Sequence, residues 1–182
     1  MKGEESVNHL YTVKKAIKGN EDAFEELIKI ESAKLYKTAF LYVRNKEDAL
    51  DILQDTVCKA FVSIGSLKQP EYFSTWLTKI LIRTAYEFLK KKKKVVLIES
   101  AFFENKAAVN KESELDLPYA ISTLNHHYQT VIILFYYHDL SIRTIAETMK
   151  KPEGTIKTYL RRAKAELKHV LEGGHQYGQK MV

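Results

Sequence analysis

The chain has 182 residues, enough for one domain or two small ones, and 45% of them are hydrophobic, which excludes wholesale disorder. The formal net charge of +6 favours an anionic partner. A single cysteine, Cys58, excludes an internal disulfide and is typical of a reducing cytosol. There is no run of about 18 apolar residues, and the first twenty residues lack the apolar core of a signal peptide, so we expect no membrane insertion.

The hydrophobic periodicity is helical throughout and predicts an all-α protein of two helical domains. Residues 1–20 are assigned to an N-terminal extension. Residues 21–44 predict a long amphipathic helix, with Asn20 as its N-cap and acidic residues in its first turn.

Residues 46–64 predict a second helix with two distinct faces. Its expected buried stripe is Leu50, Leu53, Val57, Phe61 and Ile64. Asp48, Asp51 and Asp55 lie on another face at spacings of three and four, where like charges repel one another mildly. Such a stripe indicates a basic protein partner, although a solvated acidic face is the simpler alternative.

A loop over 65–71 precedes a third helix over 72–94, whose core face is Phe73, Leu77, Ile80, Leu81, Thr84 and Phe88. The rest of its surface mixes aromatic and basic side chains and ends in five consecutive lysines. Aromatic rings can stack on bases while cations follow the phosphate backbone, so this surface indicates single-stranded nucleic acid. A solvated helix end that complements the helix dipole is the alternative explanation of the lysine run.

Residues 95–114 lose the helical period and predict an interdomain linker with short apolar patches. Residues 115–139 predict two more helices, the second being a buried segment from Thr130 to Leu140. Gly173 and Gly174 are expected to stop the last helix, leaving 173–182 as a tail.

Residues 141–168 predict a helix, a tight turn and a second helix dense in Lys and Arg, which is the layout of a helix-turn-helix DNA-binding motif. Pro152 suits the first turn of the second helix. The turn requires a positive φ, which Lys150 or Lys151 must adopt in place of the usual Gly. The expected buried residues are Ile142, Ile145, Ala146, Met149, Ile156, Leu160, Ala163 and Leu167. A plain helical hairpin with a solvated basic face is the alternative.

Enzyme chemistry finds little support in the sequence. His126 and His127 are adjacent on a helix, so their side chains diverge by about 100°, and no third metal ligand has a fitting spacing. His138 and Asp139 could form an acid–base pair, and Cys58 a redox switch, but a small buried thiol is the simpler interpretation of Cys58. No phosphate-binding glycine loop is present. We therefore predict no enzyme activity, no metal and no cofactor.

Three segments together resemble the extracytoplasmic-function sigma factors, the small two-domain class of the sigma-70 family of bacterial RNA polymerase. They are NKEDALDILQDTVCKAF at 45–61, YFSTWLTKILIRTAYEFLKK at 72–91, and LSIRTIAETMKKPEGTIKTYLRRAKAEL at 140–167. The resemblance implies region 2 over 21–94, which docks on core polymerase and recognises and melts the minus-10 element. It implies region 4 over 115–172, which recognises the minus-35 element.

The resemblance also implies site residues. Those expected to dock on the β′ clamp helices are Asp48, Asp51, Gln54 and Asp55. Those expected at the melted minus-10 strand, with a flipped base held by the 66–72 loop and Trp76, are Ser66, Lys68, Tyr72, Trp76, Lys79, Arg83, Tyr86 and Lys90. Those expected at the minus-35 duplex are Thr155, Lys157, Thr158, Tyr159, Arg161 and Arg162.

The implied partners are core RNA polymerase through the β′ clamp helices and the β flap, double-stranded and melted promoter DNA, and an anti-sigma factor. The implied location is the cytoplasm, or the membrane when an anti-sigma factor holds the protein there, in a stress response. The chain has Arg83 where the family often has Asn, Glu87 for Asp, Thr144 for Glu, Lys150 for Gly and Tyr159 for Arg. A stand-alone helix-turn-helix regulator with a helical sensor domain is the competing function.

Overall fold

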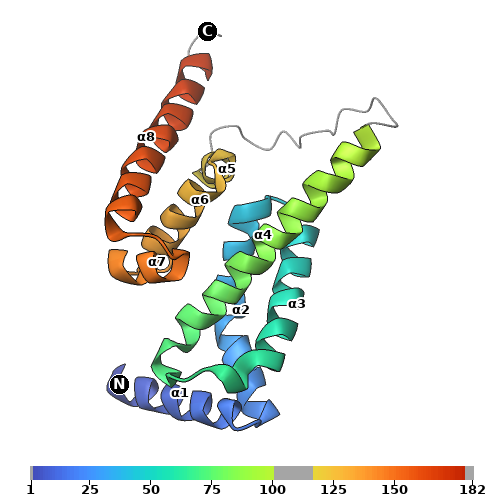
Figure 1. Cartoon of the computed structure of the whole chain (residues 1–182), viewed down its shortest axis with the longest axis vertical. Coiled ribbons are helices and arrows are strands. Elements are labelled where there is room, and N and C mark those ends of the chain that lie inside the picture. Colours follow the sequence, from blue (N-terminus) through green and yellow to red (C-terminus); the bar gives the residue numbers. More distant parts are fainter. Residues whose placement is uncertain (1, 101–116, 179–182) are drawn as a thin grey trace. The chain divides into compact units, whose positions relative to one another are not determined.

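The computed structural model describes residues 2–100 and 117–178, with side chains described over 8–92 and 117–172. Every regular element in these ranges is a helix or a helical turn, which confirms the all-α class (Figure 1). The chain divides into two compact units, Met1–Phe40 with Asn45–Phe88, and Leu41–Arg44 with Leu89–Val182. Over the described residues, no helix combines the length and the apolar character needed to span a bilayer.

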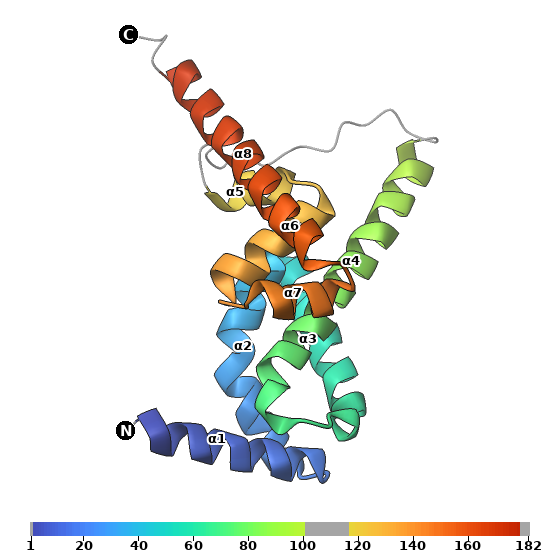
Figure 2. The same ribbon diagram turned by 60° about the vertical axis from the view of Figure 1, so that its left-hand side comes forward.

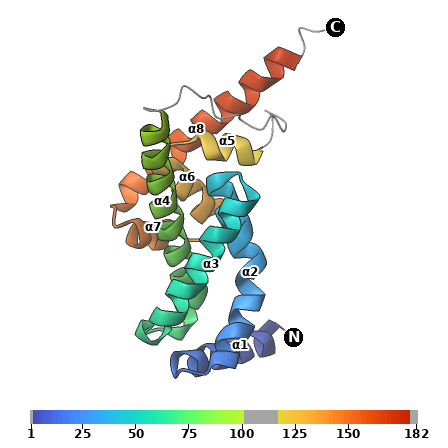
Figure 3. The same cartoon turned by 90° about the vertical axis from the view of Figure 1, so that its right-hand side faces the viewer.

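The first unit is built on three helices that lie side by side in Figures 1 and 3: α2 (Glu21–Val43) as far as Phe40, α3 (Lys46–Ser63), and α4 (Phe73–Ser100) as far as Phe88. The rings of Phe24 and Phe61 join α2 to α3 edge to face, with centroids 5.3 Å apart. Ser74 of α4 donates a hydrogen bond to the carboxylate of Glu31 on α2. The largest fully buried side chains of this unit are Val13, Leu27, Leu35, Ile52, Phe73, Leu77 and Leu81.

The predicted cap of α2 is confirmed. Oδ1 of Asn20 accepts a hydrogen bond of 2.7 Å from the backbone N–H of Ala23. Asn45 caps α3 in the same way, through a 2.8 Å bond from the N–H of Asp48. Such caps satisfy backbone donors that the helix itself leaves without a partner, and each contributes about 1 kcal/mol.

The sequence did not predict that the N-terminal extension contains a packed helix. Helix α1 (Lys2–Ile17) crosses one end of the first unit (Figure 1), beside the helical turns Ile64–Ser66 and Pro70–Tyr72. Val13 and Ala16 are fully buried, and the ring of His9 lies 6.2 Å from that of Phe73. Among the side chains of α1 that the structure describes, those buried are Thr12, Val13 and Ala16. The sequence of the helix is largely polar, so it gave a weak periodic signal.

The predicted buried stripe of α3 is wrong at most positions. The buried residues are Ala49, Ile52, Thr56 and Ala60, whereas Leu50 is 55% exposed and Phe61 46% exposed. Periodicity rules favour the largest apolar residues, so they choose the wrong face of a helix whose buried positions include two alanines and a threonine. Of the predicted stripe only Ile64, just beyond the helix, is buried.

Helix α4 keeps most of its predicted core, since Phe73, Leu77, Leu81 and Thr84 are buried, while Ile80 and Phe88 are only half-buried. The predicted helix ends at Lys94 and Gly173 are wrong, because α4 continues to Ser100 and α8 to Gly178. A glycine costs a helix about 1 kcal/mol without forbidding it. The rest of the predicted linker, 101–116, lies outside the described residues.

The second unit contains α5 (Leu117–Thr123), α6 (His126–Ile132), a π-helical turn (Ile133–Tyr137), α7 (Ile142–Met149) and α8 (Glu153–Gly178). Helix α6 begins before the predicted Thr130, since Asn125 caps it through a bond from the N–H of Tyr128. Figure 2 shows α7 at a steep angle to α8. Their facing side chains Ile145, Ile156 and Ala163 are fully buried.

The turn between α7 and α8 has the backbone geometry that the sequence required. Lys150 adopts φ 52° and ψ 49°, in the left-handed region. The next N–H, that of Lys151, donates to the carbonyl of Ala146 at 3.0 Å and closes the end of α7. The prediction that a lysine takes the place of glycine is therefore confirmed at Lys150.

Replacing Lys150 by glycine is expected to stabilise the protein by about 0.5–1 kcal/mol. A side chain in the left-handed region is strained, and glycine removes that strain. Lys151→Gly is the matched control, because Lys151 has no positive φ and glycine there only adds freedom to the unfolded chain. Urea unfolding of both variants checks this, and equal destabilisation by the two changes would contradict it.

Candidate polymerase and nucleic-acid interfaces

The exposed face of α3 combines acidic and apolar side chains. Asp51, Gln54 and Asp55 are exposed and Asp48 is half-buried. Asp51 and Asp55 have no ion-pair partner among the residues that the structure describes. The large exposed side chains of Leu50 and Phe61 lie on the same helix. A protein partner could bury the apolar groups while its cations neutralise the carboxylates.

The loop that leads into α4 presents polar and aromatic groups. Ser66 is exposed and its hydroxyl donates to the carbonyl of Ser63 at 2.7 Å, while Lys68 is exposed. Tyr72 is 52% exposed. Trp76 is half-buried, with its ring 5.9 Å from that of Phe73. The end of the loop and the first turns of α4 therefore offer one exposed aromatic ring, that of Tyr72, and one half-buried ring, that of Trp76.

Along α4, the predicted cations and Tyr86 are exposed: Lys79, Arg83, Tyr86 and Lys90. The structure brings Arg83 together with a residue that the sequence did not single out. Lys59 of α3 lies across from it, and Nζ of Lys59 donates to Oε2 of Glu87 at 3.0 Å and to the hydroxyl of Thr84 at 3.2 Å. Lys59 was missed because the pairing joins two helices and leaves no periodic signal in either.

These ionic contacts lie in a groove of about 610 Å³ between α3 and α4. The residues that line it are Cys58, Lys59, Val62, Ser63, Ile80, Arg83, Thr84 and Glu87. Hydrogen bonds from Lys59 and Arg83 lower the pKa of Glu87, so this carboxyl is ionised at neutral pH. The prediction that Cys58 is buried is wrong, since its thiol is exposed at the groove. The groove thus combines two cations, one anion and the apolar side chains of Val62 and Ile80.

The predicted buried stripe of α8 is confirmed, with Ile156, Leu160, Ala163 and Leu167 buried. The opposite side of the helix carries Lys157, Arg161 and Arg162, all exposed. Thr155 and Thr158 are half-buried, and the hydroxyl of Thr158 donates to the carbonyl of Gly154 at 2.9 Å. The three basic side chains are free to reach a nucleic acid along one helix.

Tyr159 lies among other rings. It stacks on His127 with centroids 5.5 Å apart and planes 15° apart, and Tyr128 lies 5.6 Å away. These contacts join the start of α8 to α6 and leave Tyr159 half-buried. No group of three His, Cys, Asp or Glu side chains in the described residues could hold a metal ion.

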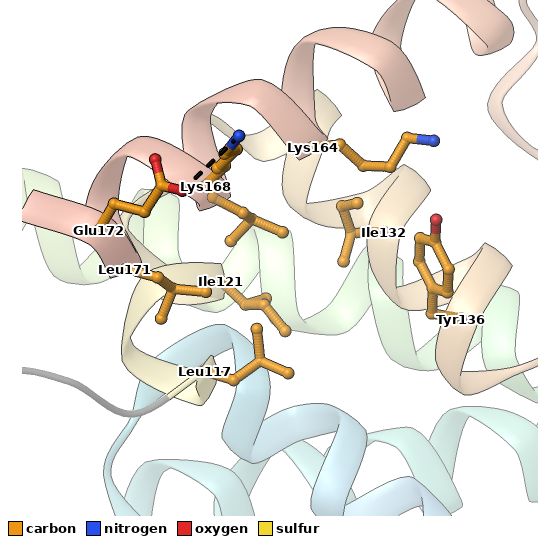
Figure 4. Close-up of a pocket in the computed structure, with 9 residues that line it drawn as sticks. Leu117, Ile121, Ile132, Tyr136, Lys164, Lys168, Leu171 and Glu172 are labelled. Carbon is orange, nitrogen blue, oxygen red and sulfur yellow. Dashed lines mark ion pairs between the residues drawn. The ribbon is translucent and has the colours of Figure 1, made fainter.

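The second unit also contains an apolar groove of about 640 Å³ (Figure 4). Its apolar lining includes Leu117 and Ile121 of α5 and Leu171 of α8, with Ile132 and Tyr136 farther along it. Its rim is charged, since Lys168 pairs with Glu172 at 3.6 Å. Lys164, on the flank of α8, lines this groove.

Comparisons with known proteins agree with this arrangement. The family model "Sigma-70 region 2" matches residues 27–95, and "Sigma-70, region 4" matches 114–167. RNA polymerase sigma factor SigV of Bacillus subtilis (strain 168) is 40% identical over 130 residues, which are 70% of this chain and 78% of that protein. ECF RNA polymerase sigma factor SigW of the same bacterium is 28% identical over 176 residues, covering 87% and 94% of the two chains.

Among solved structures, the fold is similar to that of sigma factor RpoE from Bartonella quintana, solved with the anti-sigma factor NepR. The TM-score is 0.68 at 24% identity, covering 82% of this chain and 96% of that one. The match to SigV covers more than two thirds of that relative, and the two family models fall on the two sets of exposed residues described above. This chain belongs to the extracytoplasmic-function sigma factors of the sigma-70 family, transcription initiation factors that bind core RNA polymerase and direct it to promoters.

Proposed function

We propose that the two units divide promoter recognition between them. The observation that supports this most strongly is in the first unit, where an exposed acidic and apolar face on α3 adjoins an exposed aromatic and basic face on α4. The second unit adds a basic helix, α8, and an apolar groove. The stand-alone regulator is not favoured, because a sensor domain does not need these two faces. The match of residues 27–95 to sigma region 2 also argues against it.

The first face docks on core polymerase. Asp51, Gln54 and Asp55, with Asp48 at the edge, contact the β′ clamp helices, and Leu50 and Phe61 are buried in that contact. The apolar groove of the second unit accepts the β flap. Both contacts are with protein, and the chain itself contributes recognition rather than catalysis.

The second face binds the melted minus-10 strand. Tyr72 and Trp76 offer rings for stacking a flipped base, which costs a few kcal/mol to extract from the duplex. The groove between α3 and α4 adds Lys59 to this set. The polar and basic side chains that follow the strand are Ser66, Lys68, Lys79, Arg83, Tyr86 and Lys90.

Helix α8 binds the minus-35 duplex. Lys157, Arg161 and Arg162 reach base edges, where an arginine can bind guanine bidentately. Thr155 and Thr158 contact phosphates and fix the register. Tyr159 orients α8 through its stack on His127 and borders the DNA with its remaining surface.

We further propose that an anti-sigma factor controls this protein in the cytoplasm. The similar sigma factor of Bartonella quintana was solved with an anti-sigma factor, and CnrH, of TM-score 0.67 and 19% identity, with the cytosolic domain of CnrY. An inhibitor bound over the α3 face would keep the factor from polymerase. Displacement of the anti-sigma factor by core polymerase in a competition assay would test this.

Tyr72→Ala is expected to lower open-complex formation about tenfold, because stacking on an aromatic side chain contributes about 1–3 kcal/mol per base. Tyr72 is largely exposed, so folding and polymerase binding should not change. The fluorescence of 2-aminopurine placed in the minus-10 element reports melting. Tyr11→Ala, at a tyrosine that is 58% exposed on α1, is the control. Equal fluorescence from both variants would contradict the proposed role.

A further inference from the structure

Glu87 is the point where the ionic contacts of α3 and α4 meet. Its Oε1 accepts a hydrogen bond from Nε of Arg83 at 3.0 Å, one turn earlier on α4. Its Oε2 accepts from Nζ of Lys59 on α3, also at 3.0 Å. The hydroxyl of Thr84, which is 2% exposed, is a second acceptor for Lys59. One carboxylate therefore contacts both cations that line the groove.

Stability does not explain this arrangement. The side chains of Glu87 and Lys59 are 42% and 44% exposed, and that of Arg83 is 82% exposed. Ion pairs this open to solvent contribute from about 0 to 1 kcal/mol, because water and salt screen them. The buried residues of α4 hold the helices together without Glu87. The carboxylate of Glu87 instead influences where the Arg83 and Lys59 side chains point, and it lowers the net charge of the three side chains from +2 to +1.

The contact with Arg83 uses one particular nitrogen. A guanidinium has five N–H donors, and Glu87 engages the one on Nε. The two terminal NH₂ groups then remain as a planar fork, and the contact with Glu87 favours one orientation of that fork. Lys59, held by two acceptors, keeps one N–H for a further partner. An oriented fork can distinguish base edges, whereas one with no preferred orientation binds any phosphate.

We propose that Glu87 is a specificity-determining positioning residue for the minus-10 strand: it orients the guanidinium fork of Arg83 and the ammonium of Lys59 in the groove and offsets one of their two charges. The proposal rests on the assignment of α4 to the minus-10 element. With Glu87 present, the groove has a net charge of +1 and oriented donors, and it selects a base. A groove of net charge +2 with mobile donors binds the backbone of any sequence.

The test replaces Glu87 by Gln in the full chain bound to bacterial core polymerase. Transcription is measured over a DNA library randomised in both promoter elements. We expect the minus-10 preference to fall by up to about fivefold, because the exposed ion pair orients the Arg83 fork only by the small energy of such a pair, with the minus-35 preference unchanged. Binding to random single-stranded DNA should become tighter at low salt and lose affinity more steeply as salt is raised, by a slope of about 0.7 for one added phosphate contact.

Glu147→Gln is the matched control, because Glu147 of α7 accepts from Nε of Arg143 at 3.3 Å with the same spacing of four residues. It removes the same charge and the same kind of pair from the other unit. Arg83→Lys is a second variant that keeps the charge but removes the fork, so we expect it to lose the minus-10 preference as well. If either Glu87→Gln or Arg83→Lys retained the wild-type minus-10 preference, the positioning role would be overturned.

The same data separate this proposal from the function on which it rests. A wild-type protein that transcribes without any minus-10 preference would contradict the assignment of α4 itself. A wild-type preference that Glu87→Gln leaves intact would overturn the role of Glu87 alone. Loss of preference in Glu87→Gln and Arg83→Lys, with Glu147→Gln like the wild type, supports both.

Discussion

Replacing Asp51 and Asp55 together by alanine is expected to weaken binding to core RNA polymerase about 100-fold and to leave folding unchanged. Both side chains are exposed on α3, and neither has an ion-pair partner in the described residues, so their loss removes no stabilising contact. It relieves the mild repulsion between carboxylates one turn apart. In the complex, removal of a carboxylate from a desolvated charge pair costs about 2–5 kcal/mol, and each 1.4 kcal/mol is a tenfold change in affinity.

The matched control is the double change Asp22→Ala with Glu26→Ala on α2, where two exposed carboxylates have the same spacing of four residues. Both double variants change the net charge by the same amount, so a general electrostatic effect would change their affinity for core polymerase equally. Fluorescence anisotropy of labelled protein titrated with core polymerase measures the affinity. Wild-type affinity in the Asp51 and Asp55 variant, with an unchanged melting temperature, would remove α3 from the docking surface.

Arg162→Ala is expected to lower promoter-specific transcription by about 10- to 100-fold. Arg162 is exposed on the side of α8 away from its buried stripe, so truncation leaves the core of the second unit intact. A bidentate arginine–guanine contact provides about 1–3 kcal/mol of discrimination between bases. The loss should therefore depend on the minus-35 sequence and should be small on promoters in which that element is scrambled.

Lys14→Ala is the control for Arg162→Ala, because it removes one exposed positive charge from α1 in the other unit. A phosphate contact would behave differently from a base contact, since it would weaken all sequences alike. Transcription from a matched pair of promoters, one with the minus-35 element scrambled, distinguishes these roles. An equal loss from both promoters would place Arg162 on the backbone rather than on a base.

The sequence predicted best those features that depend on local chemistry. The positive φ of Lys150 follows from the need to end α7 within one residue, and the capping of α2 by Asn20 from the need to satisfy its first N–H groups. The stripe of α8 from Ile156 to Leu167 was clear because its opposite side is strongly charged. In each case residues close together in the sequence decide the local structure, so the sequence is sufficient to predict it.

The sequence failed where partners distant in the chain decide the outcome. Leu50 and Phe61 were assigned to the core of α3 because they are large and apolar, but the structure buries Ala49 and Ala60 instead. The exposed pair then became part of the proposed polymerase surface, which periodicity could not reveal. The contact of Lys59 with Glu87 spans 28 residues and two helices, so it too was visible only in the structure.

Transcription by bacterial core polymerase with this protein, over a promoter library randomised upstream of the start site, tests the division of recognition between the two units most directly. We predict that active promoters share two sequence blocks at a fixed spacing, one altered by Arg162→Ala and the other by Arg83→Lys. A single shared block that both variants alter alike would contradict the division. So would tight binding of duplex DNA by the protein alone, without any binding to core polymerase.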